Sequence, residues 1–445
     1  MEDNIYEKKS INHLILYFSI PAILSLIVEI MASVVDTAFA GHLGLESIDA
    51  LTAMGLVTPL LNLFTAIQSL FAVSTSIFIA KYLNDKLKRD EYFASGIIMT
   101  LIVSSLLSIA CYLGINQILN ILNAKAKVYL FAKSYLKVQF ISNIFSSLGY
   151  TLTSVIRSFG YPKIEMLITT LAVFVNIIFN GLFVFGLNFG FIGLALGTLF
   201  SEIFCALYAY LWLKKHCLLP NSFHLSLKRF KDCTKELSKL GIAQAIIQAM
   251  GGCTGFFVNN SLMIHSGSVY VAVWNVVSNI YTLFLMPIVG ITQAVQTIIA
   301  YFSGQGKNKE KNKTIRSTIA TTVLYGIIAT AIVFVFSNQI LAVFIKDVEL
   351  ITIANSVIKI IFISFSITGI FYTIMTLLEI TEHETKAVIM ILTRQVFLIV
   401  PLVYVLPIIL HKLSLAIFLA VPIADIVALC ISLLLVKKHK CRLIN

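Results

Sequence analysis

Long apolar runs separated by short polar segments recur along the whole chain. A helix that spans a membrane needs about 20 mostly apolar residues, and the runs reach that length repeatedly. The predicted spans are residues 14–40, 51–80, 93–115, 132–156, 164–187, 189–213, 240–264, 269–302, 315–336, 350–378, 387–410 and 413–436. This pattern predicts an all-α integral membrane protein with twelve transmembrane helices.

Basic residues are concentrated between alternate pairs of runs. If the N-terminus lies in the cytoplasm, 26 of the 33 Lys and Arg residues fall in cytoplasmic segments. Short cytoplasmic loops of membrane proteins carry an excess of Lys and Arg. The bias therefore predicts a multi-pass membrane protein with both termini in the cytoplasm.

The composition changes this picture little. Hydrophobic residues make up 58% of the chain and charged residues 12%, too few to cover a soluble domain of this size. The net charge of +12 comes largely from the segments between runs, so membrane lipid is the expected partner and nucleic acid is not. The seven cysteines form no Cys-x-x-Cys pair and are expected to be small buried packing residues. No cofactor is expected.

An internal repeat divides the chain into halves. The string LKKHC at 213–217 returns as VKKHK at 436–440, and at the same offset of 223 residues Glu202 falls on Asp425. Each half then holds six spans, and halves with an even number of spans are related by an axis along the membrane normal. We predict two pseudo-symmetric six-helix lobes, residues 1–215 and 237–445, joined by a basic cytoplasmic linker at 216–236 and separated by a central cleft.

Polar groups inside the spans indicate a functional or structural role, because placing an ionised side chain in hydrocarbon costs free energy. Asp36 lies in the outer part of the first span, and Asn176, Asn180 and Thr198 lie at similar depth on the fifth and sixth spans. Oxygen atoms from carboxylates, amides and hydroxyls suit a small hard cation, and a desolvated carboxylate can carry a proton instead. These four residues are the predicted ion-coupling site for H⁺ or Na⁺. The alternative is a polar cluster that only holds helices together.

Other polar residues of both halves are candidates for a substrate-binding cavity. Glu29 lies seven residues before Asp36, so both carboxylates project from one helix face. Glu202 and Asp425 are secondary acid candidates, and Pro21 is expected to kink the first helix, since proline removes a backbone hydrogen bond. The predicted cavity for a small organic molecule is lined by Glu29, Gln68, Gln244, Gln248, Asn275, Asn279 and Tyr281.

At this point the chain resembles the multidrug and toxic compound extrusion (MATE) family of prokaryotic transporters over essentially its whole length. The most specific element is the Asp-x-x-x-x-Gly-His-Leu-Gly string that closes the first span. The strings that carry the resemblance are SIPAILSLIVEIMASVVDTAFAGHLG (19–44), RSFGYPK (157–163), NIIFNGLFVFG (176–186), GTLFSE (197–202) and SGQGKNKEKN (303–312).

The resemblance implies two lobes that rock between inward-open and outward-open states and export cationic, amphipathic compounds in exchange for Na⁺ or H⁺. It implies a cation site to which Asp36, Asn176 and Thr198 contribute. Asn180 stands where some members have a second aspartate, which removes one negative charge and leaves proton or weak Na⁺ coupling. The resemblance also implies a bacterial-type plasma or inner membrane, and a monomer is expected.

Two other function classes remain as alternatives. A flippase for lipid-linked sugars or polar lipids of the same superfamily is the first, although the near absence of mid-span Lys and Arg favours cationic cargo. A membrane-embedded enzyme is the second. It would need a convergent catalytic constellation, and no His-x-x-x-His or His-Glu-x-x-His string occurs. We therefore expect no enzymatic activity.

Overall fold

The computed structural model describes residues 5–41, 43, 47–122, 124, 126–220, 226–266, 268–344, 348–380, 383–410 and 415–437. Most of these residues lie in helices, and none lies in a strand. Nine described stretches are long and apolar enough to cross a membrane, and a bent pair of helices supplies a tenth. Two further helices of 33 and 39 residues, α6 and α9, are more polar and complete the twelve passes.

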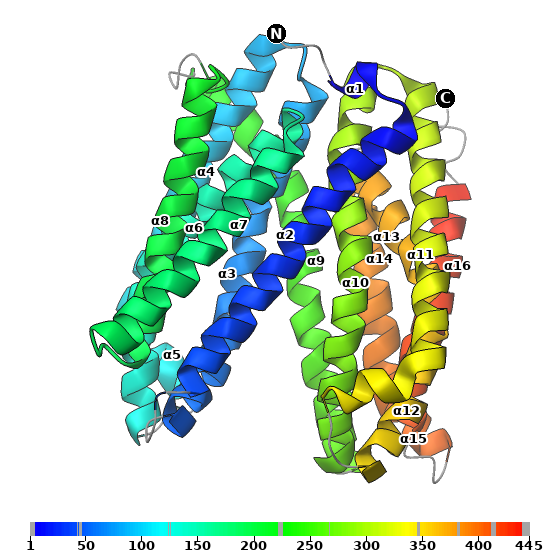
Figure 1. Cartoon of the computed structure of the whole chain (residues 1–445). Helices are drawn as coiled ribbons and strands as arrows, with labels where there is room; N and C mark the ends of the chain where they lie inside the picture. The colour runs from blue at the N-terminus through cyan, green and yellow to red at the C-terminus, as the bar shows by residue number, and fades with distance from the viewer. Residues whose placement is uncertain are drawn as a thin grey trace. The chain divides into compact units, whose positions relative to one another are not determined.

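The chain divides into two compact units. Unit 1 comprises Met1–Lys8 and Leu24–Ala245, and unit 2 comprises Lys9–Ile23 and Ile246–Asn445. Unit 1 is the blue to green half of the chain in Figure 1. Its helices are α1 (Ile5–Lys8), most of α2 (Ile11–Gly41), α3 (Ser47–Lys81), α4 (Lys86–Leu113), α5 (Ile115–Ile121), α6 (Ala126–Ser158), α7 (Pro162–Gly181), the π-helical η2 (Leu182–Gly186), α8 (Phe191–Lys215) and the start of α9 (Leu227–His265).

Helix α6 lies at the centre of unit 1, in contact with α3, α4, α7 and α8. Close approach between these helices depends on small residues. A Cβ atom on Gly96 of α4 would lie 2.1 Å from the hydroxyl oxygen of Thr75 on α3, so only glycine fits there. The tight turn from α6 to α7 uses Gly160, whose φ of 97° is costly for any other residue. Pro162 then starts α7, a position where its missing N–H costs nothing.

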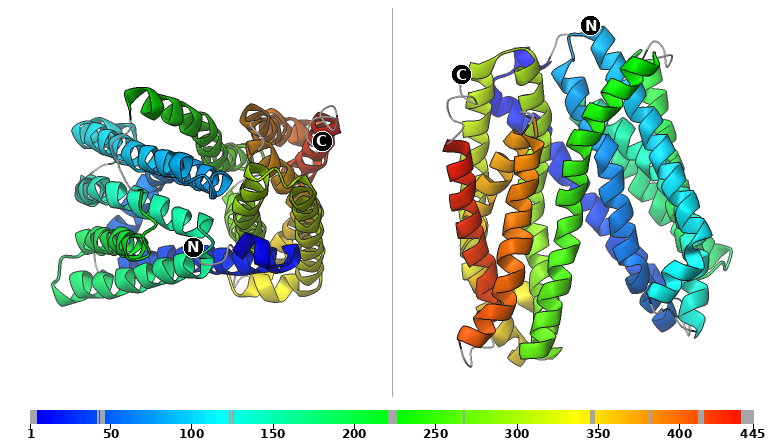
Figure 2. Two further views of the ribbon diagram at one scale, coloured as in Figure 1. Left: turned by 90° about the horizontal axis from the view of Figure 1, so that it is seen from above. Right: turned by 180° about the vertical axis from the view of Figure 1, so that it is seen from behind.

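Unit 2 is built around α10, α11 and α13, with a core that includes the fully buried Phe362 and Phe365. The two further views in Figure 2 show its helices from above and from behind. They are the remainder of α9, α10 (Ser268–Gly304), α11 (Asn308–Ala342), α12 (Val348–Phe362), α13 (Phe365–Ile380), α14 (Glu384–Leu392), the π-helical η3 (Thr393–Ile399), α15 (Val400–Ile409), the 3₁₀ segment η4 (Ala416–Leu419) and α16 (Ala420–Lys437).

Some helices differ from their predicted form. The span predicted at 350–378 is two helices, α12 and α13, bent by 43° at the break between them. The π-helical turn of η3 ends two residues before Pro401, which has no N–H to continue the regular hydrogen-bond ladder. The short helices α1 and α5 were not predicted, because neither is long enough to show an apolar period.

The limits of the units differ from the predicted lobes 1–215 and 237–445 in two places. Residues 9–23, which include the start of α2, belong to unit 2, where Ser317 donates a hydrogen bond to Asn12 at 2.7 Å. Residues 216–245 belong to unit 1, where Tyr92 donates a hydrogen bond to Glu236. Helix α2 thus passes from one unit to the other two residues after Pro21 and remains one helix there. A kink at Pro21 stays a prediction.

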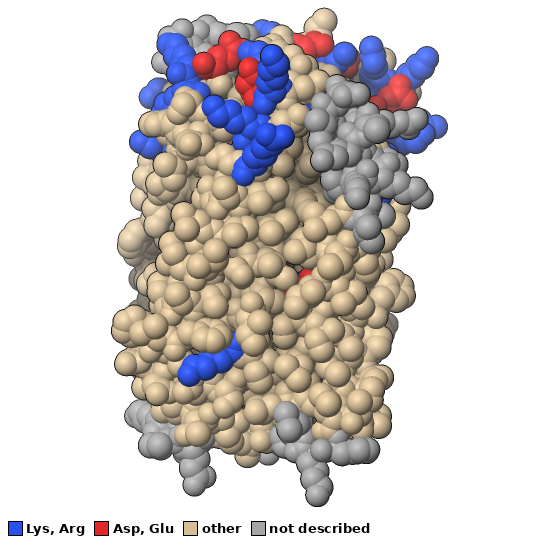
Figure 3. Space-filling model, turned by 90° about the vertical axis from the view of Figure 1, so that its right-hand side faces the viewer, with Lys and Arg blue, Asp and Glu red and all other residues tan. Residues whose placement is uncertain are grey.

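The distribution of charge fits a membrane environment. On the face shown in Figure 3, the Lys, Arg, Asp and Glu side chains gather at one end, and a broad band beyond them is almost free of charge. Large apolar side chains such as Leu106, Ile109, Phe174 and Ile178 are exposed on the outside of unit 1. Exposed apolar rows on long helices belong against lipid. The chain is therefore a multi-pass membrane protein, as the sequence predicts.

Candidate functional site

Four polar side chains from three helices of unit 1 meet in one hydrogen-bonded cluster. The side-chain amide of Asn180 on α7 donates to the carboxylate of Asp36 on α2 at 2.5 Å. The same nitrogen donates to the amide oxygen of Asn176 at 3.0 Å. Asn176 in turn donates to the hydroxyl of Thr198 on α8 at 3.4 Å. The structure thus brings together the four residues predicted to couple the ion.

The cluster is largely closed to solvent, but one of its oxygen atoms accepts no hydrogen bond from the described residues. Asn180 is fully buried and Asn176 nearly so, whereas Asp36 and Thr198 are half-buried. The amide oxygen of Asn180 has no hydrogen-bond partner among the described residues. A buried polar atom without a partner is unfavourable, and an oxygen of this kind beside a carboxylate suits a small cation. The donor set fits either a proton on Asp36 or a metal ion such as Na⁺.

The close packing of α7 against α8 holds this cluster together. A Cβ atom on Gly197 would lie 2.0 Å from the amide oxygen of Asn180 and 2.9 Å from its backbone nitrogen. Any side chain at position 197 would therefore push the two helices apart or turn the Asn180 amide away from Asp36.

We expect Gly197→Ala to destabilise unit 1, since overpacking a tight contact costs about 1–3 kcal/mol. The measurement is the thermal unfolding midpoint of the purified protein in detergent. Gly55→Ala on α3 is the matched control, because a Cβ atom there meets nothing within 4 Å. Equal midpoints for Gly197→Ala and the control would show that α7 and α8 are not packed as tightly as described.

Tyr135 of α6 is a neighbour of the cluster that the sequence did not single out. Its buried phenol lies within electrostatic range of Asp36. The apolar pattern that predicts this span does not indicate that Tyr135 lies near Asp36. Tyr135 therefore joins the candidate site from the structure alone.

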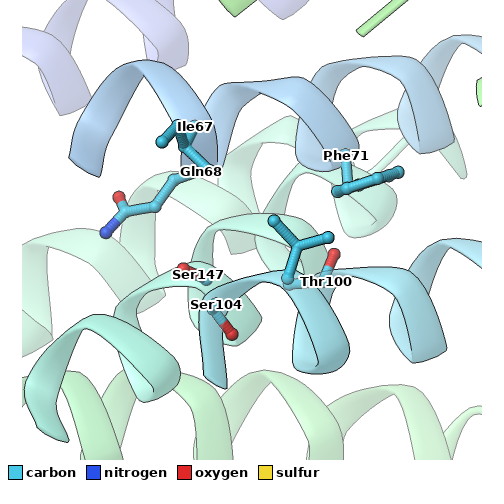
Figure 4. Close-up of a pocket in the computed structure, with 7 residues that line it drawn as sticks. Ile67, Gln68, Phe71, Thr100, Ser104 and Ser147 are labelled. Atoms are coloured by element: carbon cyan, nitrogen blue, oxygen red, sulfur yellow. The ribbon is translucent and has the colours of Figure 1, made fainter. Parts of the chain in front are cut away.

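Gln68, predicted to line the substrate cavity, takes part in a network inside unit 1. Its amide donates to Asn143 at 3.0 Å, and Asn143 donates to Ser108 at 3.0 Å. Gln68 also lies beside a cavity of about 10 Å³, room for about one water molecule. Figure 4 shows this cavity, with side chains of α3, α4 and α6 around it. Its lining residues are Ile67, Gln68, Phe71, Thr100, Val103, Ser104 and Ser147.

The other predicted cavity residues are divided between the two units. Glu29 and Gln244 belong to unit 1, whereas Gln248, Asn275, Asn279 and Tyr281 belong to unit 2. The side chains of Glu29, Gln248, Asn275 and Asn279 are exposed. Tyr281 packs edge-on against Phe362 and Phe365, with ring centroids 5.8 and 5.4 Å apart. A common cavity for all seven residues stays a prediction.

The two secondary acid candidates have different surroundings. Asp425 on α16 forms a buried ion pair with Arg394 on η3 at 2.6 Å, and its second oxygen accepts a hydrogen bond from Ser364 at 2.6 Å. Glu202 on α8 has Ser146 as a polar neighbour instead. Arg394 lies inside the membrane span predicted at residues 387–410. Arg394 is buried inside a helical segment, where a membrane protein tolerates it because Asp425 balances its charge.

Ionisable residues inside the spans of membrane proteins commonly mark ion or substrate pathways, so the fold and the cluster around Asp36 point to the class of membrane transporters. The family model of MatE matches residues 21–182 and 245–405, one stretch in each half and well over half of the chain together. The chain belongs to the MatE family.

Relatives and solved structures agree with this assignment. The multidrug export protein MepA of Staphylococcus haemolyticus is 25% identical over 405 residues, which cover 90% of this chain and 88% of that protein. A multidrug resistance MATE family transporter of the MOP superfamily, in an outward-facing conformation, matches with a TM-score of 0.89 and 20% identity, over 100% of this chain and 99% of the other. A MOP superfamily transporter from Pyrococcus furiosus matches with the same values. The predicted family and the twelve-helix, two-lobed fold class are confirmed.

Proposed function

We propose that the protein is a secondary active efflux transporter that exports amphipathic, cationic organic compounds in exchange for H⁺ or Na⁺. Export of drugs is supported by similarity to the MepA proteins, named as multidrug exporters, along 90% of the chain. Ion coupling is supported by one observation above all. Asp36 lies with Asn176, Asn180 and Thr198 in a largely closed cluster, in which the amide oxygen of Asn180 has no hydrogen-bond partner among the described residues.

Coupling requires that the ion bind two conformations with different affinity, because a ligand shifts an equilibrium only by its differential binding. Asp36 can supply this difference in affinity. Its negative charge is neutralised when a proton or Na⁺ is bound, and it is left uncompensated when the ion has gone. Rocking of the two lobes would then open the cavity to one side at a time. With only one carboxylate in the cluster, a proton or weakly bound Na⁺ is the coupling ion.

The substrate would lie in a cavity lined by the polar residues predicted from both halves, Glu29 among them. An exposed carboxylate attracts a cationic group, and Tyr281 offers an aromatic face to the apolar part of the molecule. The protein would act as a monomer in a bacterial plasma membrane.

Cells that express the chain should retain less ethidium than vector controls, and an ionophore that collapses the ion gradients should abolish the difference. Unchanged retention of ethidium, together with movement of fluorescent-headgroup lipids between leaflets, would favour the flippase alternative.

We propose that both termini lie in the cytoplasm, on the strength of the bias in Lys and Arg. In a background without native cysteines, Ser226→Cys in the linker should react with a membrane-impermeant maleimide only after the cells are opened. Gln117→Cys, predicted to lie outside, should react in intact cells. Both side chains at these positions are exposed in the structure. Labelling of the linker in intact cells would reverse the orientation.

A further inference from the structure

A buried lysine without a partner lies in the second turn of α11 in unit 2. Lys311 is 9% exposed, and its ammonium group forms no hydrogen bond, ion pair or ring contact with any described residue. A buried charge is strongly unfavourable unless it is paired and hydrogen-bonded. We therefore expect an acceptor for this ammonium group that the described residues do not supply.

The internal repeat gives Lys311 a counterpart in unit 1. Helix α4 begins at Lys86 and helix α11 at Asn308, 222 residues later, and at this offset Arg89 falls on Lys311. The buried faces of the two helices coincide in the same alignment. Buried positions 89, 92, 96, 100 and 104 of α4 fall on buried positions 311, 314, 318, 322 and 326 of α11.

In unit 1, carboxylates satisfy the positive charge at the start of α4. Arg89 donates to the carboxylate of Asp90 from Nε at 3.1 Å and from a terminal nitrogen at 2.9 Å. Its guanidinium also lies over the ring of Phe159, 5.4 Å from the centroid. The carboxylate of Asp85 caps the helix, because it accepts the backbone N–H of Lys88 at 3.3 Å. Both the buried cation and the helix end thus have an anionic partner.

Unit 2 has neither of these carboxylates. At the same offset Lys307 stands where unit 1 has Asp85, and Asn312 stands where it has Asp90. An ammonium group cannot accept a hydrogen bond, and the start of α11 has no side-chain cap. The helix end and the ammonium group of Lys311 therefore lack the negative charges that their counterparts have.

The charge around the two helix starts differs in the same direction. Residues 85–94 hold three basic and three acidic residues, whereas residues 307–316 hold five basic residues and one acid. The N-terminus of a helix carries a partial positive charge and binds anions such as phosphate. The start of α11 is thus a basic helix end without the acids that balance α4.

The length of α11 places this end at a membrane surface. Its 35 residues span about 52 Å at 1.5 Å per residue, whereas the hydrocarbon core of a bilayer is about 30 Å thick. The polar first turns of the helix therefore extend into the headgroup layer. Phosphate groups of lipids are concentrated in that layer.

We propose that the start of α11 binds a phosphate group, with the Lys311 ammonium and the backbone N–H groups of the first turn as donors, and that an anionic phospholipid supplies it. Helical side chains lean toward the N-terminus, so the side chain of Lys311 runs back toward these N–H groups. The preceding turn leaves room, because a Cβ atom on Gly306 would meet nothing within 4 Å. A lipid is favoured over free phosphate because the site lies at the membrane surface.

The thermal unfolding midpoint of the purified protein in an uncharged detergent tests this site without any transport. A ligand that binds only the folded state raises the midpoint, so phosphatidylglycerol should raise it more than equal concentrations of phosphatidylcholine or inorganic phosphate. Lys311→Met keeps a long apolar side chain and removes the ammonium group. It should weaken the apparent affinity for phosphatidylglycerol about tenfold or more, since a hydrogen bond between charged groups is lost. Lys311→Arg should retain most of the affinity.

Lys313→Met is the matched control, because it removes the same charge from an exposed neighbour on the same helix. Asn312→Asp places a carboxylate where unit 1 has Asp90 and should also weaken phosphatidylglycerol binding, although every basic residue remains. This variant decides the question if Lys311→Met does not fold.

Equal affinities for phosphatidylglycerol in Lys311→Met and Lys313→Met, or in Asn312→Asp and the parent, would overturn the site. A shift with inorganic phosphate as large as that with phosphatidylglycerol, and lost in Lys311→Met, would support the phosphate site but overturn its assignment to a lipid.

Discussion

The Asp36→Asn protein is expected to fold and insert normally but to lose all gradient-driven export, falling to the rate of vesicles without protein. The substitution keeps the size and hydrogen bonding of the side chain, so Asn180 can still hydrogen-bond to it. It removes the only carboxylate of the cluster, and with it the group that an ion can neutralise in one conformation and leave in another. The measurement is ethidium movement into proteoliposomes under an imposed pH or Na⁺ gradient.

Asp49→Asn at the start of α3 is the matched control, since it removes an acid outside the cluster. Parent-level export by Asp36→Asn under both gradients, at equal protein content, would place the coupling site elsewhere. Glu29 and Glu202 would then be the first candidates, because Glu29 lies on the same helix as Asp36 and Glu202 lies on the same helix as Thr198.

The second large effect concerns stability rather than transport. Asp425→Ala should lower the free energy of unfolding by about 3–5 kcal/mol, because it leaves the buried guanidinium of Arg394 without a counter-charge. Arg394→Met should lower the free energy of unfolding by a similar amount, because it leaves the buried carboxylate of Asp425 without a counter-charge. The measurement is the thermal midpoint in detergent together with the amount of protein inserted in the membrane.

The double variant Asp425→Leu with Arg394→Met separates the ion pair from simple loss of packing. Replacing both charges by apolar groups of similar volume is often nearly neutral, so the double variant should recover most of the stability lost in each single variant. A double variant as unstable as the sum of the two singles would mean that the pair contributes no coupling between α16 and η3.

Much of the fold follows from the length and spacing of apolar runs. Each run of about 20 residues can satisfy its backbone in lipid only as a helix, so the number of passes and their approximate limits were accessible from the sequence. The meeting of Asp36 with Asn180 was accessible too. Two amides four residues apart share a helix face, and polar groups of similar depth seek one another in a membrane.

Other features could not be read from the sequence, for identifiable physical reasons. Hydrophobicity does not show what balances the charge of Arg394 inside a predicted span, and only tertiary contact shows that Asp425 does so. The break before Phe365 carries no proline or glycine, and Ser364 at the break donates a hydrogen bond to Asp425, a contact that the apolar pattern does not predict. The ion pair between Arg157 at the end of α6 and Glu165 in the first turn of α7 likewise depends on the turn between the two helices. The apolar pattern does not predict the shape of that turn.

Ion-coupled export is the central claim, and transport by the purified parent protein in proteoliposomes tests it most directly. The pH gradient and the Na⁺ gradient are imposed separately, and ethidium movement is followed in the direction opposite to the ion. The account predicts that at least one gradient drives ethidium against its own concentration difference, and that collapse of that gradient stops it at once. Ethidium movement that never exceeds equilibrium under either gradient would contradict the claim.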